Sequence, residues 1–245
     1  MKKNLILLLI VGLFSNAQNF NYGLKLGTNL SLPNSENNIK PKQDVGFLVG
    51  AIGEYAFNEK FSLQAELSYQ KTNSTHEFNK TKIHGGSTKV EEKINITQNY
   101  LISQFQLPVL FKYYPIKNLA IEAGPNIGMV ITNKLQINQT NNYRYTQGQI
   151  STLTVGENTY HYEIDMDDPD SYGKHDFKLN KIQLGLNIGA MYQFDFGLFT
   201  QIRYNYALNN LSENSIFRSD KLDPALNNTP LKLSNVQLSL GYFFN

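Results

Sequence analysis

The chain has 245 residues and a formal charge of +2, which comes from the N-terminus because residues 18–245 carry 20 basic and 20 acidic side chains. This neutral balance gives no reason to expect nucleic acid or anionic lipid as the main partner. The sequence contains no cysteine, which excludes a disulfide framework, thiol catalysis, a cysteine-based zinc site and a lipoprotein anchor.

The first predicted element is a secretory signal peptide over residues 1–17. A positively charged start precedes an apolar run of ten residues, Leu5–Phe14, and Ser15–Ala17 has the small-x-small pattern of a cleavage site. Ten apolar residues are too few to span a hydrocarbon core of about 30 Å, so we favour cleavage over a membrane anchor. The sequence therefore predicts an exported protein with a mature domain over residues 18–245.

Eight later segments alternate apolar and polar residues, which is the pattern of a half-buried β-strand. The clearest is Phe61–Gln70, with apolar residues at odd positions and polar residues at even positions. The apolar faces of the predicted strands run over residues 20–30, 45–57, 61–69, 101–113, 119–131, 182–194, 198–208 and 236–244. Together these faces hold 50 residues without a single charge, although 17% of the whole chain is charged.

The opposite faces of the predicted strands are polar and rich in glycine. A face of 5–7 apolar residues per strand matches a bilayer crossed at a tilt. Glycines on the polar faces, such as Gly23, Gly27 and Gly124, fit strands that crowd around a narrow lumen. A soluble β-sandwich also alternates, but its polar face lies in water and needs no such thinning.

The predicted connections alternate in length. Three are short, over residues 58–60, 114–118 and 195–197, and four are long, over residues 31–43, 71–98, 132–178 and 209–232. Outer-membrane barrels place short turns on the periplasmic rim and long loops outside, whereas Greek-key sandwiches do not sort their connections in this way. The sequence therefore predicts an all-β fold: an eight-stranded antiparallel up-and-down transmembrane β-barrel with short periplasmic turns and long extracellular loops. Because lipid leaves no strand edge unpaired, the last strand must pair with the first.

Five short segments of these strands carry a family resemblance. They are Leu107–Tyr114, Ala123–Gly128, Gly185–Gly189, Arg203–Tyr206 and Leu240–Phe244. They resemble the PorT-type outer-membrane β-barrel family of Bacteroidetes-like bacteria, whose members are often named "porin family" by fold alone. The resemblance implies a place in the cell outer membrane and says little about activity. One branch is associated with type IX secretion, but no motif here places the chain in that branch.

Seven charged residues on the polar faces are candidates for ion pairs in the lumen. They are Lys25, Glu54, Glu66, Lys112, Glu122, Lys181 and Arg203. Eight strands leave a lumen only wide enough for side chains to fill, and buried charges need compensation. We therefore favour a paired, hydrogen-bonded plug over a gated conductance or a proton path.

Two long connections hold the remaining candidate chemistry. Residues 132–178 contain an acidic cluster with two histidines, made up of His161, Glu163, Asp165, Asp167, Asp168, Asp170, His175 and Asp176. Carboxylates are ligands for Ca²⁺, but the spacing is not that of an EF-hand, and no G-x-S-x-G motif supports a hydrolase. Residues 71–98 are rich in lysine and could contact lipopolysaccharide phosphates, but nearby glutamates offset this charge. In both segments we favour a solvated connection without metal.

The leading hypothesis is a non-enzymatic integral outer-membrane barrel that binds no cofactor. It either stabilises the envelope or presents residues 71–98 and 132–178 for binding. The expected partners are outer-membrane lipid and lipopolysaccharide, the barrel-assembly machinery during biogenesis, and a protein that contacts the extracellular loops. The alternatives are an outer-membrane enzyme, an accessory subunit of a secretion or uptake machine, and a narrow passive pore.

Overall fold

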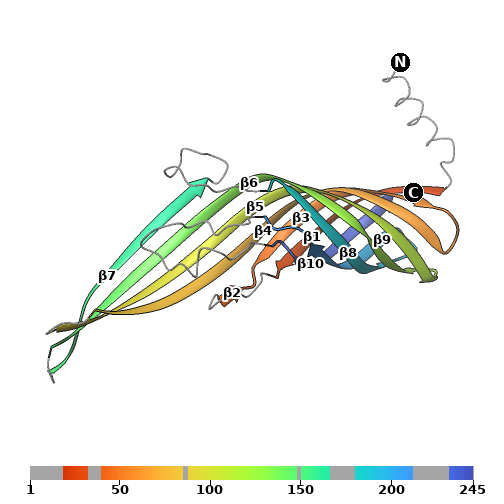
Figure 1. Cartoon of the computed structure of the whole chain (residues 1–245). Coiled ribbons are helices and arrows are strands. Elements are labelled where there is room, and N and C mark those ends of the chain that lie inside the picture. Colours follow the sequence, from red (N-terminus) through yellow and green to blue (C-terminus); the bar gives the residue numbers. More distant parts are fainter. Residues whose placement is uncertain are drawn as a thin grey trace, which may run out of the picture.

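The computed structural model describes residues 19–32, 40–84, 88–147, 150–165, 180–211 and 232–244. In this part of the chain no helix is long and apolar enough to cross a membrane. The described strands are β1 (Phe20–Ser31), β2 (Lys40–Lys42), β3 (Val45–Ala56), β4 (Phe61–His84), β5 (Thr88–Ile116), β6 (Leu119–Gln147), β7 (Ile150–Asp165), β8 (Ile182–Gln193), β9 (Leu198–Ala207) and β10 (Asn235–Phe244) (Figure 1). The predicted signal peptide lies outside the described residues.

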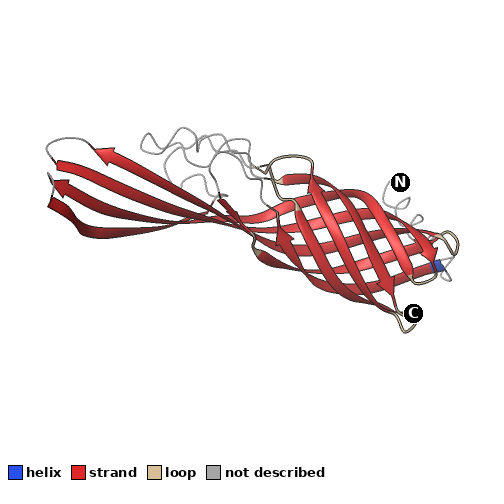
Figure 2. Cartoon of the chain, turned by 90° about the horizontal axis from the view of Figure 1, so that it is seen from below, coloured by secondary structure: helices blue, strands red, loops and turns tan. Residues whose placement is uncertain are grey.

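Eight strands close into a ring. The order is β1-β3-β4-β5-β6-β8-β9-β10, every pairing is antiparallel, and β10 pairs back with β1 from Tyr22 opposite Phe244 to Ser31 opposite Asn235. Because ring neighbours are also neighbours along the chain, this is an up-and-down barrel (Figure 2). The predicted fold class is therefore confirmed, including the pairing of the last strand with the first.

Side chains alternate between the outer wall and the lumen as the sequence predicts. Leu24 and Leu26 are exposed on the outer wall, whereas Lys25 between them is buried. Each outward Leu contributes about 1.5–3 kcal/mol when it moves from water into an apolar phase. Aromatic pairs such as Tyr22 and Phe244, with ring centroids 5.7 Å apart, lie near the end of the barrel and form part of an interfacial girdle.

The short connections are tight turns with local hydrogen bonds. Asn58 Oδ1 accepts hydrogen bonds from the backbone N–H groups of Lys60 and Phe61, at 2.9 and 3.0 Å, and so closes the β3–β4 turn. In the β8–β9 turn, Gly197 has a φ of +94°, which favours glycine, and its N–H donates to the carbonyl of Phe194. These turns define one rim of the barrel, which we call the short-turn rim.

The described parts of two predicted long loops, 71–98 and 132–178, are strands. β4 and β5 continue as a hairpin until His84 lies opposite Val90, and β6 continues past the barrel and pairs with β7 from Lys134 opposite Asp165 outwards. The distal parts of β4, β5 and β6, together with β7, form a four-stranded sheet that extends far beyond the barrel (Figures 1 and 2). We call residues 73–84, 88–101, 134–147 and 150–165 the protruding sheet.

The alternation changes phase where the protruding sheet leaves the barrel. On β5, Ile94 and Ile96 are buried on the inner side, while Asn95 between them is exposed on the outer side. In the barrel the apolar residues face outward and the polar residues face inward, because the outer wall there faces lipid. At the base of the sheet these residues join a buried apolar cluster of Tyr100, Ile102, Val130, Leu135, Ile137, Leu211 and Leu233.

Candidate functional site

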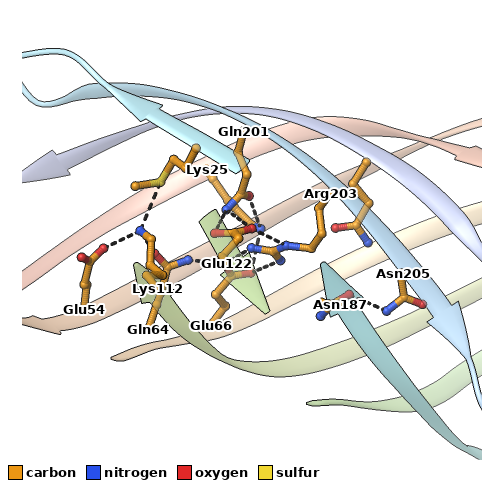
Figure 3. Close-up of polar contacts among 12 residues, drawn as sticks. Lys25, Glu54, Gln64, Glu66, Lys112, Glu122, Asn187, Gln201, Arg203 and Asn205 are labelled. Atoms are coloured by element: carbon orange, nitrogen blue, oxygen red, sulfur yellow. Dashed lines mark hydrogen bonds and ion pairs between the residues drawn. The ribbon is translucent and has the colours of Figure 1, made fainter. Parts of the chain in front are cut away.

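The centre of the lumen holds a cluster of buried charges from four strands (Figure 3). Glu66 accepts two hydrogen bonds from the Arg203 guanidinium, at 2.7 and 3.0 Å, and pairs with Lys25 Nζ at 2.7 Å. Arg203 Nε also binds Glu122 Oε1 at 2.8 Å. Gln201 donates to both Glu122 oxygens at 3.0 Å and accepts from Lys25 at 3.2 Å. Each carboxylate therefore has several donors, as buried carboxylates require.

A second ion pair lies closer to the short-turn rim. Lys112 Nζ is 2.7 Å from Glu54 Oε2 and donates to Gln64 Oε1 at 2.8 Å. The other Glu54 oxygen accepts hydrogen bonds from the Tyr114 and Ser62 hydroxyls, at 2.6 and 2.7 Å. The arrangement satisfies the carboxylate from three sides and holds the ammonium group next to the barrel wall.

The two clusters form one network without net charge. Gln64 donates a hydrogen bond to Glu66 and so connects them (Figure 3). The network contains three cations and three carboxylates, and each of these side chains exposes at most 4% of its surface. Removing one member would leave a partner buried and uncompensated, which costs about 3–5 kcal/mol for a buried pair. We call this set of six charged side chains the lumen network.

An apolar cluster, which we call the floor, packs against the network among lumen-facing residues near the short-turn rim. It consists of Ile52, Ala120, Met191, Phe199 and Phe243, with Tyr114 packed against it. The rings of Phe199 and Phe243 are buried, with centroids 5.0 Å apart. Gly241 makes room for this packing, because a Cβ atom there would lie 2.2 Å from Phe199 Cζ. Sequence analysis missed the floor, although its signal was present in two large aromatic residues on otherwise polar faces.

Side-chain amides fill the lumen on the other side of the network. Asn205 donates to Asn187 at 2.7 Å, and Gln237 donates to Gln70 at 3.2 Å. Several buried amide oxygens here accept no hydrogen bond from another protein group within the described ranges; examples are those of Asn29, Gln104, Asn126, Gln183 and Asn235. Buried amide oxygens of this kind are normally satisfied by water. This half of the lumen is therefore polar, in contrast to the floor.

The structure brings six of the seven predicted lumen residues together. The exception is Lys181, which lies just before β8 with an exposed side chain and does not reach the lumen network. Its backbone carbonyl accepts a hydrogen bond from Val130 N–H at 2.8 Å. The sequence predicts a lumen position for Lys181 because the residue continues the polar face of the strand, but at this height the side chain is exposed to solvent.

Only part of the predicted acidic cluster can be placed. His161 and Glu163 lie exposed on the outer side of β7, where His161 Nδ1 is 2.6 Å from Asn138 Oδ1 and Glu163 pairs with Lys134 at 3.0 Å. The hydrogen bond from Lys134 lowers the pKa of Glu163. Asp165 ends β7, while Asp167, Asp168, Asp170, His175 and Asp176 lie outside the described residues. Across the ranges that the structure covers, no three His, Cys, Asp or Glu residues gather to hold a metal ion.

Near the base of the protruding sheet, a buried histidine faces the inner side. His76 Nε2 lies 3.2 Å from the Ser74 hydroxyl, and its ring packs edge-on against Tyr100 with centroids 5.4 Å apart. Burial lowers the pKa of His76, and the nearby Asp44 carboxylate partly opposes this effect. His76 is therefore a packing residue that resists protonation.

A closed antiparallel ring with an apolar outer wall and a polar, filled interior defines a membrane-spanning β-barrel. The sequence profile of the outer membrane protein beta-barrel domain matches residues 16–213. The chain therefore belongs to this family and is an outer-membrane protein.

The protein is also similar to solved outer-membrane barrels. Ail, the attachment invasion locus protein of Yersinia pestis, is 11% identical, with 92% of this chain and 99% of that chain covered and a TM-score of 0.42. OprG from Pseudomonas aeruginosa is 14% identical, with 93% and 97% covered and a TM-score of 0.42. A search of curated protein sequences finds no match. Similarity at this level carries no information about ligands or activity.

Proposed function

We propose that the protein is a non-enzymatic outer-membrane barrel that does not conduct and that presents the protruding sheet at the cell surface as a binding platform. The observation that carries the proposal is the contrast between the two ends of the molecule. Inside the barrel, the buried lumen network and the buried residues of the apolar floor support a closed lumen. The protruding sheet, in contrast, extends far beyond the barrel on the side opposite the short-turn rim (Figure 2). In outer-membrane barrels, that side faces the cell exterior.

The outer side of the protruding sheet offers rows of hydrogen-bonding groups. One row across the four strands consists of Asn79, Asn95, Thr140 and Thr159, and the next consists of Glu77, Thr97, Asn138 and His161. Such a flat array of amides and hydroxyls suits a polar macromolecule better than a small apolar ligand, which would need a concave pocket. The platform is therefore proposed to bind a protein or another polar partner.

Two measurements test this proposal. In planar bilayers, the purified protein should show no steady conductance, and a large stable conductance would overturn the closed lumen. In a pulldown from native membranes, the full chain should retain a partner that a variant with a shortened sheet loses. In that variant short turns replace residues 79–94 and 139–159, so the barrel strands remain intact. Equal recovery of the partner by both proteins would overturn the role of the sheet.

The same pulldown addresses an accessory role in a secretion or uptake machine, because it would recover the other subunits. We also propose that the chain is of the PorT type within its family, which Leu107–Tyr114 and Ala123–Gly128 support by their resemblance. Lipopolysaccharide around the barrel and the barrel-assembly machinery remain the expected partners in the membrane. Mass spectrometry of the mature protein should give Gln18 as its first residue.

A further inference from the structure

Three polar side chains lie next to one another at the end of the lumen that bears the protruding sheet. Asn235 begins β10 and lies directly opposite Ser31, the last residue of β1. The N–H of Ser31 donates to the carbonyl of Asp44 at 3.0 Å, so Asp44, the residue before β3, lies on the other side of Ser31. Because opposite residues have Cβ atoms about 4.5–5.5 Å apart, the three side chains are neighbours across the strands.

A fourth polar side chain, Asn29, completes this cluster. It lies two residues before Ser31 on the lumen face of β1, and its Oδ1 would be 2.6 Å from a Cβ atom at Gly46, the next lumen position after Asp44. Within the described ranges, each of the four side chains has a buried oxygen that no protein group binds. These oxygens are Asn29 Oδ1, Ser31 Oγ, Asp44 Oδ2 and Asn235 Oδ1.

The two amide groups hold their oxygens, not their nitrogens, toward the free space. Asn29 Nδ2 donates to the carbonyls of Phe47 and Lys71, at 3.2 and 3.0 Å. Asn235 Nδ2 donates to the carbonyl of Leu233 at 3.1 Å. Exchanging nitrogen and oxygen would place an amide oxygen against a carbonyl oxygen, so the orientation is fixed. The gathered atoms are therefore acceptors, with one hydroxyl hydrogen among them.

The Asp44 carboxylate distinguishes this cluster from the other amides of the lumen. Water can satisfy an amide oxygen, whereas a buried carboxylate oxygen needs a positive charge or strong donors. His76 is near enough to interact with Asp44, but burial lowers the pKa of His76, and the Lys42 side chain is exposed. The lumen network already balances its own charges. The cluster therefore holds one negative charge that no described side chain compensates.

We propose that Asp44, Ser31, Asn235 and Asn29 bind a hard metal cation, and that this cation is Ca²⁺. Calcium takes about 6–8 oxygen ligands in a flexible geometry, whereas Mg²⁺ demands a near-ideal octahedron and keeps several waters. The four side chains supply part of such a shell, and the partly exposed side of Asp44 admits water. Most of these ligands are neutral, which is why no group of three His, Cys, Asp or Glu residues marks the site in the described part of the chain.

The site lies across the seam where the last strand of the barrel pairs with the first. Asn235 and Ser31 are the final pair of that seam, and Asp44 leads into β3. Bound Ca²⁺ therefore ties β10, β1 and β3 together at this end of the barrel. A cation that binds only the folded barrel raises the folding equilibrium constant about tenfold at ten times its Kd. This inference goes beyond the proposed function, because neither the closed lumen nor partner binding depends on it.

Calorimetric titration tests the site on the purified full chain in phosphatidylcholine vesicles, which lack the phosphates of lipopolysaccharide. A site with one carboxylate should be weak, so we expect Ca²⁺ to bind with a Kd of about 0.1–1 mM and Mg²⁺ at least about tenfold more weakly. Absence of Ca²⁺ binding up to about 10 mM, or equal affinity for Mg²⁺, would overturn the proposal.

Asp44→Asn removes the charge with little change of shape and should weaken Ca²⁺ binding at least about tenfold. Asp195→Asn is the matched control, because it makes the same replacement at an exposed carboxylate on the short-turn rim, and its Kd should change by less than about twofold. Undiminished affinity of Asp44→Asn would contradict the site.

Ser31→Ala provides a second variant in which the carboxylate stays in place. It removes a buried hydroxyl that has no partner among the described residues, so the stability without Ca²⁺ should stay the same or rise. Its Ca²⁺ affinity should nevertheless fall about fivefold, because one ligand is lost. If Ser31→Ala bound Ca²⁺ as tightly as the natural protein, this cluster would not be the site.

Discussion

Replacing Arg203 by Ala is the sharpest test of the lumen network. The guanidinium contributes two hydrogen bonds to Glu66 and one to Glu122 at the centre of the barrel. After its removal Glu66 keeps Lys25 and Glu122 keeps Gln201, so neither carboxylate loses all its donors. The network nevertheless changes from neutral to a charge of −1 in a buried site.

The expected decrease in the free energy of unfolding of Arg203→Ala depends on the number of compensating contacts that remain. Leaving one partner of a buried pair uncompensated costs about 3–5 kcal/mol, and the larger void left by Ala adds to this. We expect a loss near the lower end, about 3 kcal/mol, because Lys25 and Gln201 still stabilise the two glutamates. Adding Glu122→Gln restores neutrality, so the double variant should recover part of the loss.

Urea unfolding of the barrel in lipid vesicles measures these differences, with folded and unfolded forms separated by their mobility on unheated gels. Lys181→Ala is the matched control, because the Lys181 side chain is exposed and belongs to no ion pair of the lumen network, and the free energy of unfolding of this variant should change by less than about 0.5 kcal/mol. A loss below about 1 kcal/mol for Arg203→Ala would refute a network held together by charge compensation. An additive double variant would refute the coupling between Arg203 and Glu122.

The other predictions concern the floor, its glycine and the buried histidine. Phe199→Ala with Phe243→Ala removes both rings of the floor, so bilayer recordings should show more frequent channel openings than for the natural protein. The absence of any increase in conductance would contradict a closing role of the floor. Gly241→Ala brings a Cβ against the Phe199 ring and to 2.6 Å from the Leu24 carbonyl oxygen, so overpacking should lower the free energy of unfolding by about 1–3 kcal/mol. Phe199→Leu should relieve only the part of this loss that comes from the ring. Burial lowers the pKa of His76, so the unfolded chain binds more protons and the stability should fall as the pH drops below the ordinary histidine value near 6.5; in His76→Gln this slope should be weaker.

The barrel strands were predictable because lipid imposes one rule along their whole length. Leu24 and Leu26 must face hydrocarbon, so Lys25 between them must face the lumen. The residue types of the network followed from the same alternation. The pairing within the network did not, because Arg203 and Glu66 are 137 residues apart and meet only through barrel closure and register. The position of Lys181 was wrong for a related reason, since strand phase does not show where the lumen ends.

The sequence did not predict the protruding sheet, because the outward residues of the sheet are polar whereas those of the barrel are apolar. On β5 the outward residues Phe105 and Leu107 are apolar, whereas further along the strand the outward residue Asn95 is polar. The apolar outer face of β5 therefore ends at Leu101, although the backbone of β5 stays paired with β6 as far as Thr88.

The same inversion of phase locates the membrane boundary. Outward apolar residues end near Leu101 on β5 and Ile131 on β6, where β6 also shows a register shift against β5. Tyr69 and Phe105, with ring centroids 5.8 Å apart, lie just below this level, as interfacial aromatics do. Beyond it the outer side is mainly polar, with Ile83 as an exposed exception, and most apolar side chains turn inward. Such a pattern favours water over lipid around the sheet, which supports the proposal that the protruding sheet stands outside the bilayer.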